Sequence, residues 1–297
     1  MYTQLLSGWK RWLLLICATS VACTVAAESA PAITLRAKFS SLEAQLRLNQ
    51  FQRPLVLDSS ETTDGVKGDI YAIVDYPIGT VSTGLNNPEH WCDVMILHIN
   101  TKYCHAVISP SGTILNVNIG KKTPQPLEDV ARVIFNYSVT TATPEYFEIT
   151  LKAKEGPLGT SDYHLLLEAV SLPNAKTFLH MTYSYSTNIF GRMAMQTYLS
   201  TIGKDKVGFT IIGKQVDGQL EYIAGTRGVV ERNTMRYYLA INAFLAASSA
   251  PQAAQLEKRL QNWFTAVEHY PRQLHEMDRA AYLEMKHAEV ARQQTTQ

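Results

Sequence analysis

Alternating apolar and polar positions dominate the middle of the chain and predict a series of short β-strands. In the last of them, Leu179, Met181, Tyr183 and Tyr185 share one face. Short loops such as residues 155–159 separate successive strands, which is typical of an antiparallel meander. The predicted strands are residues 54–57, 67–76, 114–119, 132–140, 146–153, 163–170 and 176–186.

Helical spacing of apolar residues predicts a second set of elements, several of them after the strands. Ser40 and Glu43 have the form of a capping box, so a helix is expected to begin at Ser40. The stretch 230–246 carries a broad apolar stripe and predicts a long buried helix. Further helices are expected in the second half of 78–100 and over 189–200. Two more are expected in the tail, one from 251 to about 268 and a last one that ends near 292. A β-hairpin is expected over 207–224.

The first residues read as a signal peptide. Lys10 and Arg11 precede a short apolar run that ends in small residues, so cleavage is expected after Ala27. The run is shorter than the ~20 residues that span a bilayer, which disfavours an uncleaved anchor. Lipidation at Cys23 is an open alternative. We therefore expect a periplasmic or secreted protein.

Charge adds little to this picture. Residues 1–27 contain Lys10 and Arg11 and no acidic residue, so the remaining chain has 25 basic and 26 acidic side chains. This balance gives no electrostatic reason to expect nucleic acid as a partner. No later stretch is apolar enough to predict a transmembrane segment in the mature chain.

Two cysteines, Cys92 and Cys104, remain after removal of the signal peptide. In an oxidising compartment, an isolated pair at short spacing favours a disulfide. Free buried thiols and metal ligation are the alternatives. The neighbouring histidines, at 90, 98 and 105, fit no zinc spacing, so we predict neither a metal nor a cofactor.

No catalytic motif stands out. The sequence contains no G-x-S-x-G elbow, P-loop, G-x-G-x-x-G or H-E-x-x-H. Ser161, Asp162 and His164 are close in sequence, but neighbours on a strand point to opposite faces, so a turn entering a strand is the favoured interpretation.

Charged residues gather where the long helix is predicted to begin. Arg232 and Arg236 are four residues apart, so they share a helix face and can hold a carboxylate or phosphate headgroup. Alternatively, Glu231 pairs with Arg227 in a structural cap.

The order of strand, helical region, antiparallel strands and long apolar helix resembles the START-like helix-grip fold over roughly residues 54–247. Residues 87–91, Asn-Pro-Glu-His-Trp, are similar to a D-P-E-x-W motif often seen in the first helical section of that fold. The resemblance implies an α+β fold in which a curved antiparallel sheet wraps around a long helix, with extra C-terminal helices. It also implies a cavity between sheet and helix that binds a lipid-like or other hydrophobic molecule.

These inferences divide the chain into a signal peptide (1–27), an N-terminal helix and strand segment (28–64), a START-like domain (65–247) and a C-terminal helical tail (248–297). The ligand contacts predicted in the START-like domain are Arg232, Arg236, Tyr183, Tyr185, Met181, Trp91 and Tyr238.

The leading functional hypothesis is a periplasmic binding protein for a hydrophobic small molecule or lipid. The first alternative is a hydrolase or cyclase-like enzyme that uses the same cavity, with His98, His180 or Glu231 as acid or base. The second is an interaction module that binds a protein partner through its C-terminal helices. Because the last helix is rich in charge, including Lys286 and Glu289, we expect it to present a solvated face.

Overall fold

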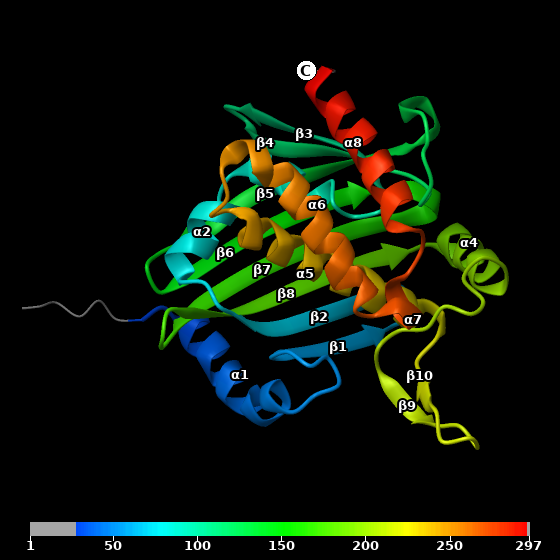
Figure 1. Ribbon diagram of the computed structural model, residues 1–297, viewed down its shortest axis with the longest axis horizontal. Coiled ribbons are helices and arrows are strands. Elements are labelled where there is room, and N and C mark those ends of the chain that lie inside the picture. The colour runs from blue at the N-terminus through cyan, green and yellow to red at the C-terminus, as the bar shows by residue number, and fades with distance from the viewer. Residues whose placement is uncertain (1–27, 296–297) are drawn as a thin grey trace, which may run out of the picture.

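The computed structural model describes residues 28–295, so the predicted signal peptide lies outside the described residues. Its centre is one eight-stranded sheet in the order β1-β2-β8-β7-β6-β5-β4-β3, in which every neighbouring pair is antiparallel (Figure 1). The strands are β1 (Leu55–Glu61), β2 (Gly65–Val74), β3 (Thr101–Ser109), β4 (Gly112–Ile119), β5 (Ala131–Ala142), β6 (Tyr146–Glu155), β7 (Thr160–Leu172) and β8 (Lys176–Thr187).

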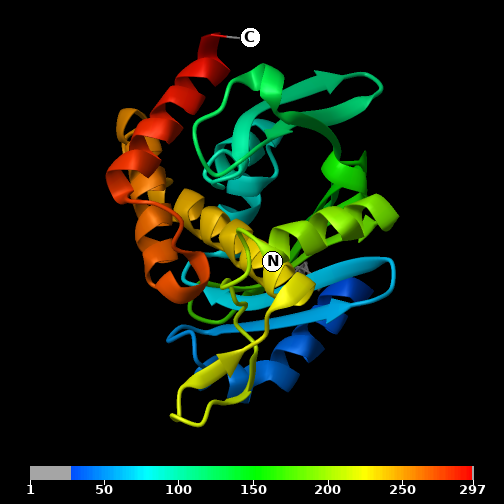
Figure 2. The ribbon, with the colours of Figure 1, turned by 90° about the vertical axis from the view of Figure 1, so that its right-hand side faces the viewer.

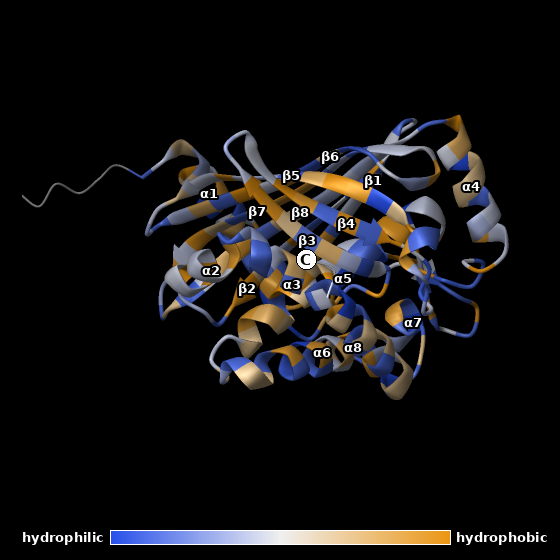
Figure 3. Cartoon of the chain, turned by 90° about the horizontal axis from the view of Figure 1, so that it is seen from above, coloured by the Kyte–Doolittle hydropathy of each residue, from blue (hydrophilic) through white to orange (hydrophobic). Residues whose placement is uncertain are grey.

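Helices cover both faces of this sheet. The long helix α5 lies along the inner face, and α6 and α8 pack outside α5 as a further layer (Figure 3). Helix α1 packs on the opposite, outer face against β1, β2 and β7 (Figure 2). The helices are α1 (Ala30–Arg47), α2 (Ile78–Leu85), α3 (Pro88–Met95), α4 (Ile189–Ser200), α5 (Gly225–Ala247), α6 (Gln252–Glu268), α7 (Pro271–Leu274) and α8 (Arg279–Thr295).

The expected fold class is confirmed: the chain is α+β, with a curved antiparallel sheet around a long helix and extra C-terminal helices. The predicted hairpin is also present, as β9 (Ile211–Lys214) and β10 (Leu220–Tyr222). Two short 3₁₀ turns, η1 (Leu127–Asp129) and η2 (Pro157–Gly159), interrupt the loops.

The apolar side chains form two clusters, one on each face of the sheet. The larger lies between the inner face and α5, and it extends through Trp263 of α6 to Tyr282 and Met285 of α8. The smaller lies beneath α1 and contains Leu35, Leu42 and Phe178. Both faces of β8 are therefore buried, and residues 177–183 are all buried, including the polar Thr177, His180 and Thr182.

Three local predictions were wrong. A helix was expected only in the second half of residues 78–100, but α2 (Ile78–Leu85) occupies the first half. The first helix begins at Ala30 and not at Ser40, because Ala32 and Leu35 continue the buried stripe upstream and Pro31 suits a first helical turn. Strand β3 was missed: its first four residues are all buried, including Lys102, so the alternation that marks a half-buried strand is absent.

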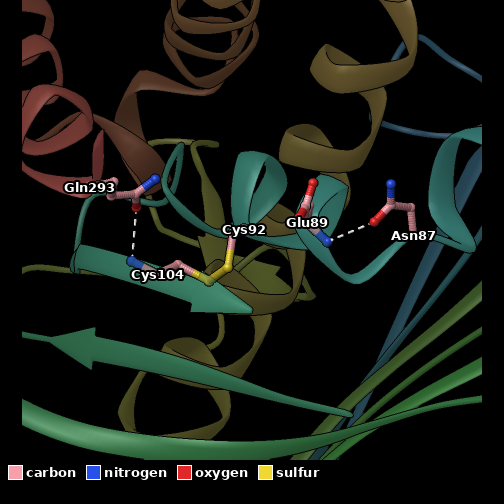
Figure 4. The surroundings of a disulfide bond; sticks show 5 residues. All are labelled: Asn87, Glu89, Cys92, Cys104 and Gln293. Atoms are coloured by element: carbon pink, nitrogen blue, oxygen red, sulfur yellow. Dashed lines mark hydrogen bonds between the residues drawn. A yellow bond between two sulfur atoms is a disulfide. The ribbon is translucent and has the colours of Figure 1, made fainter. Parts of the chain in front are cut away.

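The predicted disulfide is present. Cys92 of α3 and Cys104 of β3 are bonded, with their Cα atoms 5.1 Å apart (Figure 4). The backbone N–H of Cys104 donates to Oε1 of Gln293, 2.8 Å away, so the end of α8 reaches the same strand. Helix α3 begins at Pro88, and the side chain of the preceding N-cap residue, Asn87, accepts from the N–H of Glu89. Disulfide and α8 thus hold β3 from two sides.

The C-terminal helices are not a solvated appendage. Lys286 and Glu289 of α8 are 0% and 2% exposed, which contradicts the expectation of a solvated face there. Within residues 28–295, no helix combines the length and the apolar character needed to cross a bilayer.

Candidate functional site

A cavity of about 310 Å³ lies where α4 and η2 meet the inner face of the sheet and α5. Its α4 wall is formed by Ala194, Met195 and Tyr198. Leu158 of η2 also lines it and is 76% exposed, so the cavity reaches the surface beside α4. The volume is at the lower end of the ~300–1,000 Å³ range for small-molecule sites. A compact ligand therefore suits it.

Four tyrosines make up much of the inner wall: Tyr163 of β7, Tyr183 and Tyr185 of β8, and Tyr237 of α5. The two-residue period of a strand places Tyr183 and Tyr185 on the same face. The rings of Tyr163 and Tyr185 are stacked with centroids 5.3 Å apart, and those of Tyr183 and Tyr237 are 5.1 Å apart. Burial raises the pKa of Tyr183 and of Tyr185, so both remain neutral phenols.

Three cations face the same cavity. Arg232 and Arg236 are both 2% exposed and project from one side of α5, as expected for residues four apart. Nη2 of Arg236 contacts Oε1 of Glu276 at 2.7 Å, and Nζ of Lys122 contacts the same oxygen at 2.5 Å. Nη1 of Arg232 donates to the carbonyl of Val207 at 3.1 Å. Burial lowers the pKa of Arg236, an effect that Glu276 opposes.

His98 completes this polar end. Its ring stacks on Tyr237 with centroids 4.7 Å apart. The backbone N–H of Asn100 donates to Nδ1 at 3.2 Å, which assigns the ring proton to Nε2. Burial, reinforced by Arg236 and Lys286, holds the pKa of His98 well below its ordinary value. His98 is therefore a neutral imidazole that presents an Nε2–H donor.

The predicted contacts fall into two groups. Arg232, Arg236, Tyr183 and Tyr185 line the cavity. Three others are buried elsewhere in the core: Met181 on β8, Tyr238 on α5, and Trp91, which donates to the carbonyl of Leu85.

Sequence reasoning missed Lys122, Tyr163 and Tyr237. Tyr163 is recoverable, because it lies on the same face of its strand as Leu165 and Leu167, which are buried in the inner core. Lys122 follows a turn and gives no such signal.

Of the three residues proposed as acid or base for an enzyme, one lines the cavity. His180 is on the outer face of the sheet, between Asp69 and Glu168. Glu231 is fully buried and accepts hydrogen bonds from Ser59, from Thr210 and from the backbone of Phe209, so it anchors the segment before β9. Only His98 remains at the cavity.

Glu231 and Arg227, the alternative ion pair expected from the sequence, are linked through Ser59. Both side chains bind Ser59: its hydroxyl donates to Glu231, and Arg227 donates to its oxygen atoms. Ser59 therefore bridges β1 and the first turns of α5. Within the described part of the chain, no group of three or more His, Cys, Asp or Glu side chains is arranged to hold a metal ion.

No protein-family model and no curated protein matches the chain. Solved structures do, at low similarity. An aromatase/cyclase from a Streptomyces species is 10% identical over 72% of this chain and 96% of its own, with a TM-score of 0.31. A START superfamily protein from Mycobacterium smegmatis is 12% identical, covering 50% and 88%, with a TM-score of 0.31.

Truncated norcoclaurine synthase from Thalictrum flavum is also 12% identical, covering 48% of this chain and 83% of its own, with a TM-score of 0.31. Matches this weak carry no argument about function. The helix-grip arrangement is seen in the chain's own topology, an antiparallel sheet wrapped around α5.

Proposed function

We propose that this chain is an exported protein that binds a compact hydrophobic molecule in the cavity between the sheet, α4 and α5. The observation that carries the proposal is the cavity itself, whose wall combines five tyrosine rings with a few polar groups at one end. Ligand sites typically have this composition, in which apolar surface supplies affinity and isolated polar groups fix orientation.

Binding is a better-supported role than catalysis, because two of the three acid–base candidates lie outside the cavity. A role for the tail in docking a protein partner has less support still, because α8 is packed into the main core.

Export is the second part of the proposal. It is supported by the basic start, the short apolar run and the small residues before Glu28. The disulfide between Cys92 and Cys104 is compatible with it, because disulfides persist in oxidising compartments and are rare in reducing ones.

Native mass spectrometry of the full-length gene product, purified from cells that export it, tests both parts in one measurement. The expected protein mass is that of residues 28–297 with one disulfide, together with an adduct that organic extraction releases at near one-to-one ratio. A mass that starts at Cys23 with attached acyl chains would show a lipoprotein instead. An uncleaved protein that remains free of adducts, even after incubation with hydrophobic small molecules, would overturn the proposal.

A further inference from the structure

The polar end of the cavity carries more positive charge than its carboxylates neutralise. Glu276 is shared by Arg236, Lys122 and Lys206, with Nζ of Lys206 at 3.3 Å. Arg232 forms no ion pair with any described residue, and its Nη1 donates to the backbone carbonyl of Val207. Three cations therefore share the one carboxylate of Glu276, and the buried guanidinium of Arg232 adds a further positive charge at the cavity wall. Burying a charge without a partner costs free energy unless another anion is present.

Two donors at this end also lack acceptors. Nε2 of His98 and Nε of Arg236 are buried, and neither has a hydrogen-bond partner. Both residues line the cavity. A buried donor without a partner destabilises the native state, so each such donor calls for an acceptor that the protein itself does not supply. Here two orphaned donors and an unpaired guanidinium occur around one cavity.

The tyrosines restrict the rest of the ligand. The rings of Tyr163 and Tyr185 are nearly parallel, with 20° between their planes, and the rings of His98 and Tyr237 are 24° apart. Tyr183 is tilted by 47–53° to Tyr163, Tyr185 and Tyr237, so the wall offers both ring faces and ring edges. Such a wall favours an aromatic guest, since offset and edge-to-face ring pairs contribute free energy beyond that of their buried area.

We propose that the ligand is a compact aromatic molecule bearing an oxyanion. The oxyanion accepts from Nε2–H of His98 and Nε–H of Arg236 and is neutralised by Arg232, while the tyrosines enclose the aromatic body. This inference rests on the proposed function, and it goes further by naming the ligand class.

The charge state of His98 makes this end selective. A neutral imidazole with its proton on Nε2 donates a hydrogen bond to an oxyanion without needing to be protonated first. A ligand ammonium group would meet Arg232, Arg236 and Lys122 and be repelled. A neutral amide of the same shape can accept the hydrogen bonds but gains nothing from the unpaired guanidinium.

Isothermal titration of the purified, ligand-stripped protein with three matched probes tests the inference. The probes are 2-naphthoate, 2-naphthyl phosphate and the uncharged 2-naphthamide. We expect at least one of the two anions to bind roughly ten-fold more tightly than the amide, and the tighter anion distinguishes a carboxylate from a phosphate ligand. Arg232→Gln should remove this preference. Arg192→Gln, an exposed change on α4, is the matched control and should preserve it.

Equal affinities of the wild-type protein for the amide and both anions would overturn the oxyanion while leaving a hydrophobic binding site in place. Failure of all three probes to bind would count against the proposed function itself. Both results come from the wild-type protein, so the test does not depend on whether Arg232→Gln folds.

Discussion

His180 is held between two carboxylates on the outer face of the sheet. Its Nδ1 lies 2.8 Å from Oε1 of Glu168, and its Nε2 lies 2.9 Å from Oδ1 of Asp69. The ring of Tyr71 stacks on the imidazole at 4.3 Å. Burial disfavours the charged imidazole, but the hydrogen bonds and charges of both carboxylates outweigh it, and the pKa of His180 is raised. Burial opposes ionisation of Asp69 and Glu168 as well, yet their bonds to His180 leave both pKa values lowered.

The first prediction follows from these three shifts. A histidine whose pKa is raised on folding contributes stability that is fully present below about pH 6.5, its ordinary pKa. This stability is lost as the pH rises through the pKa of the folded state. Carboxyl groups whose pKa is lowered on folding contribute stability that is present above about pH 4.5 and is lost as the pH falls. His180→Gln should therefore lower the free energy of unfolding most between about pH 5 and 6.5, by roughly 1–3 kcal/mol.

Urea unfolding at several pH values measures this difference. His287→Gln is the control, because its ion pair with Glu257 is about half exposed and should contribute little. A deficit in His180→Gln that is the same at pH 5.5 and pH 8.5 would contradict the assigned charge state.

His180 and His98 also show what residue patterns can and cannot predict. The alternation in 176–186 places His180 on the face opposite Tyr183, so the sequence already excludes it from a cavity lined by Tyr183. His98 is different. Its orphaned Nε2 depends on the backbone N–H of Asn100 and on neighbours from α5 and α8, which no local pattern specifies.

At the scale of elements, α4 is the wall that separates the cavity from solvent. The side chain of Asn188 caps it by accepting from the N–H of Gly191, and the N–H of Asn188 donates to the carbonyl of Gly159. A Cβ on Gly191 would lie 2.8 Å from the backbone oxygen of Gly159 and 3.1 Å from that of Leu158. Glycine at this position therefore lets α4 dock closely on η2.

The second prediction is that Gly191→Ala displaces α4. Because the obstructing atoms belong to the backbone, the helix must move, and we expect a loss of roughly 1–3 kcal/mol in the free energy of unfolding. Amide hydrogen exchange in α4 should become faster, as should release of bound ligand.

Gly79→Ala in α2 is the matched control, since nothing lies within 4 Å of its Cβ and alanine favours a helix by up to ~1 kcal/mol. If Gly191→Ala were as stable as Gly79→Ala, with unchanged exchange in α4, the close docking of α4 would not matter.

Elements with a regular pattern could be predicted and elements shaped by tertiary contacts could not. Strand β8 and helix α4 lie where alternation and helical spacing place them. Strand β3 does not, because α3 buries one side of it and α8 covers the buried Lys102. The burial of β3 depends on contacts with a helix almost two hundred residues away, so the residues next to β3 in the sequence do not predict it.

At the scale of the whole molecule, α8 is joined to the cavity through buried charge. Nζ of Lys286 donates to the carbonyls of His98 and Thr101, both at 2.8 Å. Glu289 contacts Nζ of Lys286 at 2.8 Å and Nζ of Lys102 at 3.0 Å. The last helix of the chain thus fixes the backbone that presents His98, so the tail and the ligand site belong to one cooperative unit.

Glu289→Gln provides the third prediction, because it keeps the shape of the side chain and removes the counter-charge of two buried lysines. Breaking a buried ion cluster by neutralising one partner typically costs about 3–5 kcal/mol, and we expect a loss of this size at pH 6. Glu284→Gln makes the same chemical change on the exposed face of α8 and should alter stability by less than about 0.5 kcal/mol.

The deficit of Glu289→Gln should also depend on pH. Burial lowers the pKa of Lys286 to about 8 even though Glu289 opposes the shift, so removal of Glu289 lowers it further. Above a depressed lysine pKa the unfolded chain binds more protons than the native protein, so the stability of the native protein rises with pH. That rise begins at lower pH in the variant, so its deficit should shrink between pH 6 and pH 8 when urea unfolding is followed at each pH. A deficit that grows over this interval would show that the lysines are not held charged by Glu289, and the link between α8 and His98 would have to rest on packing alone.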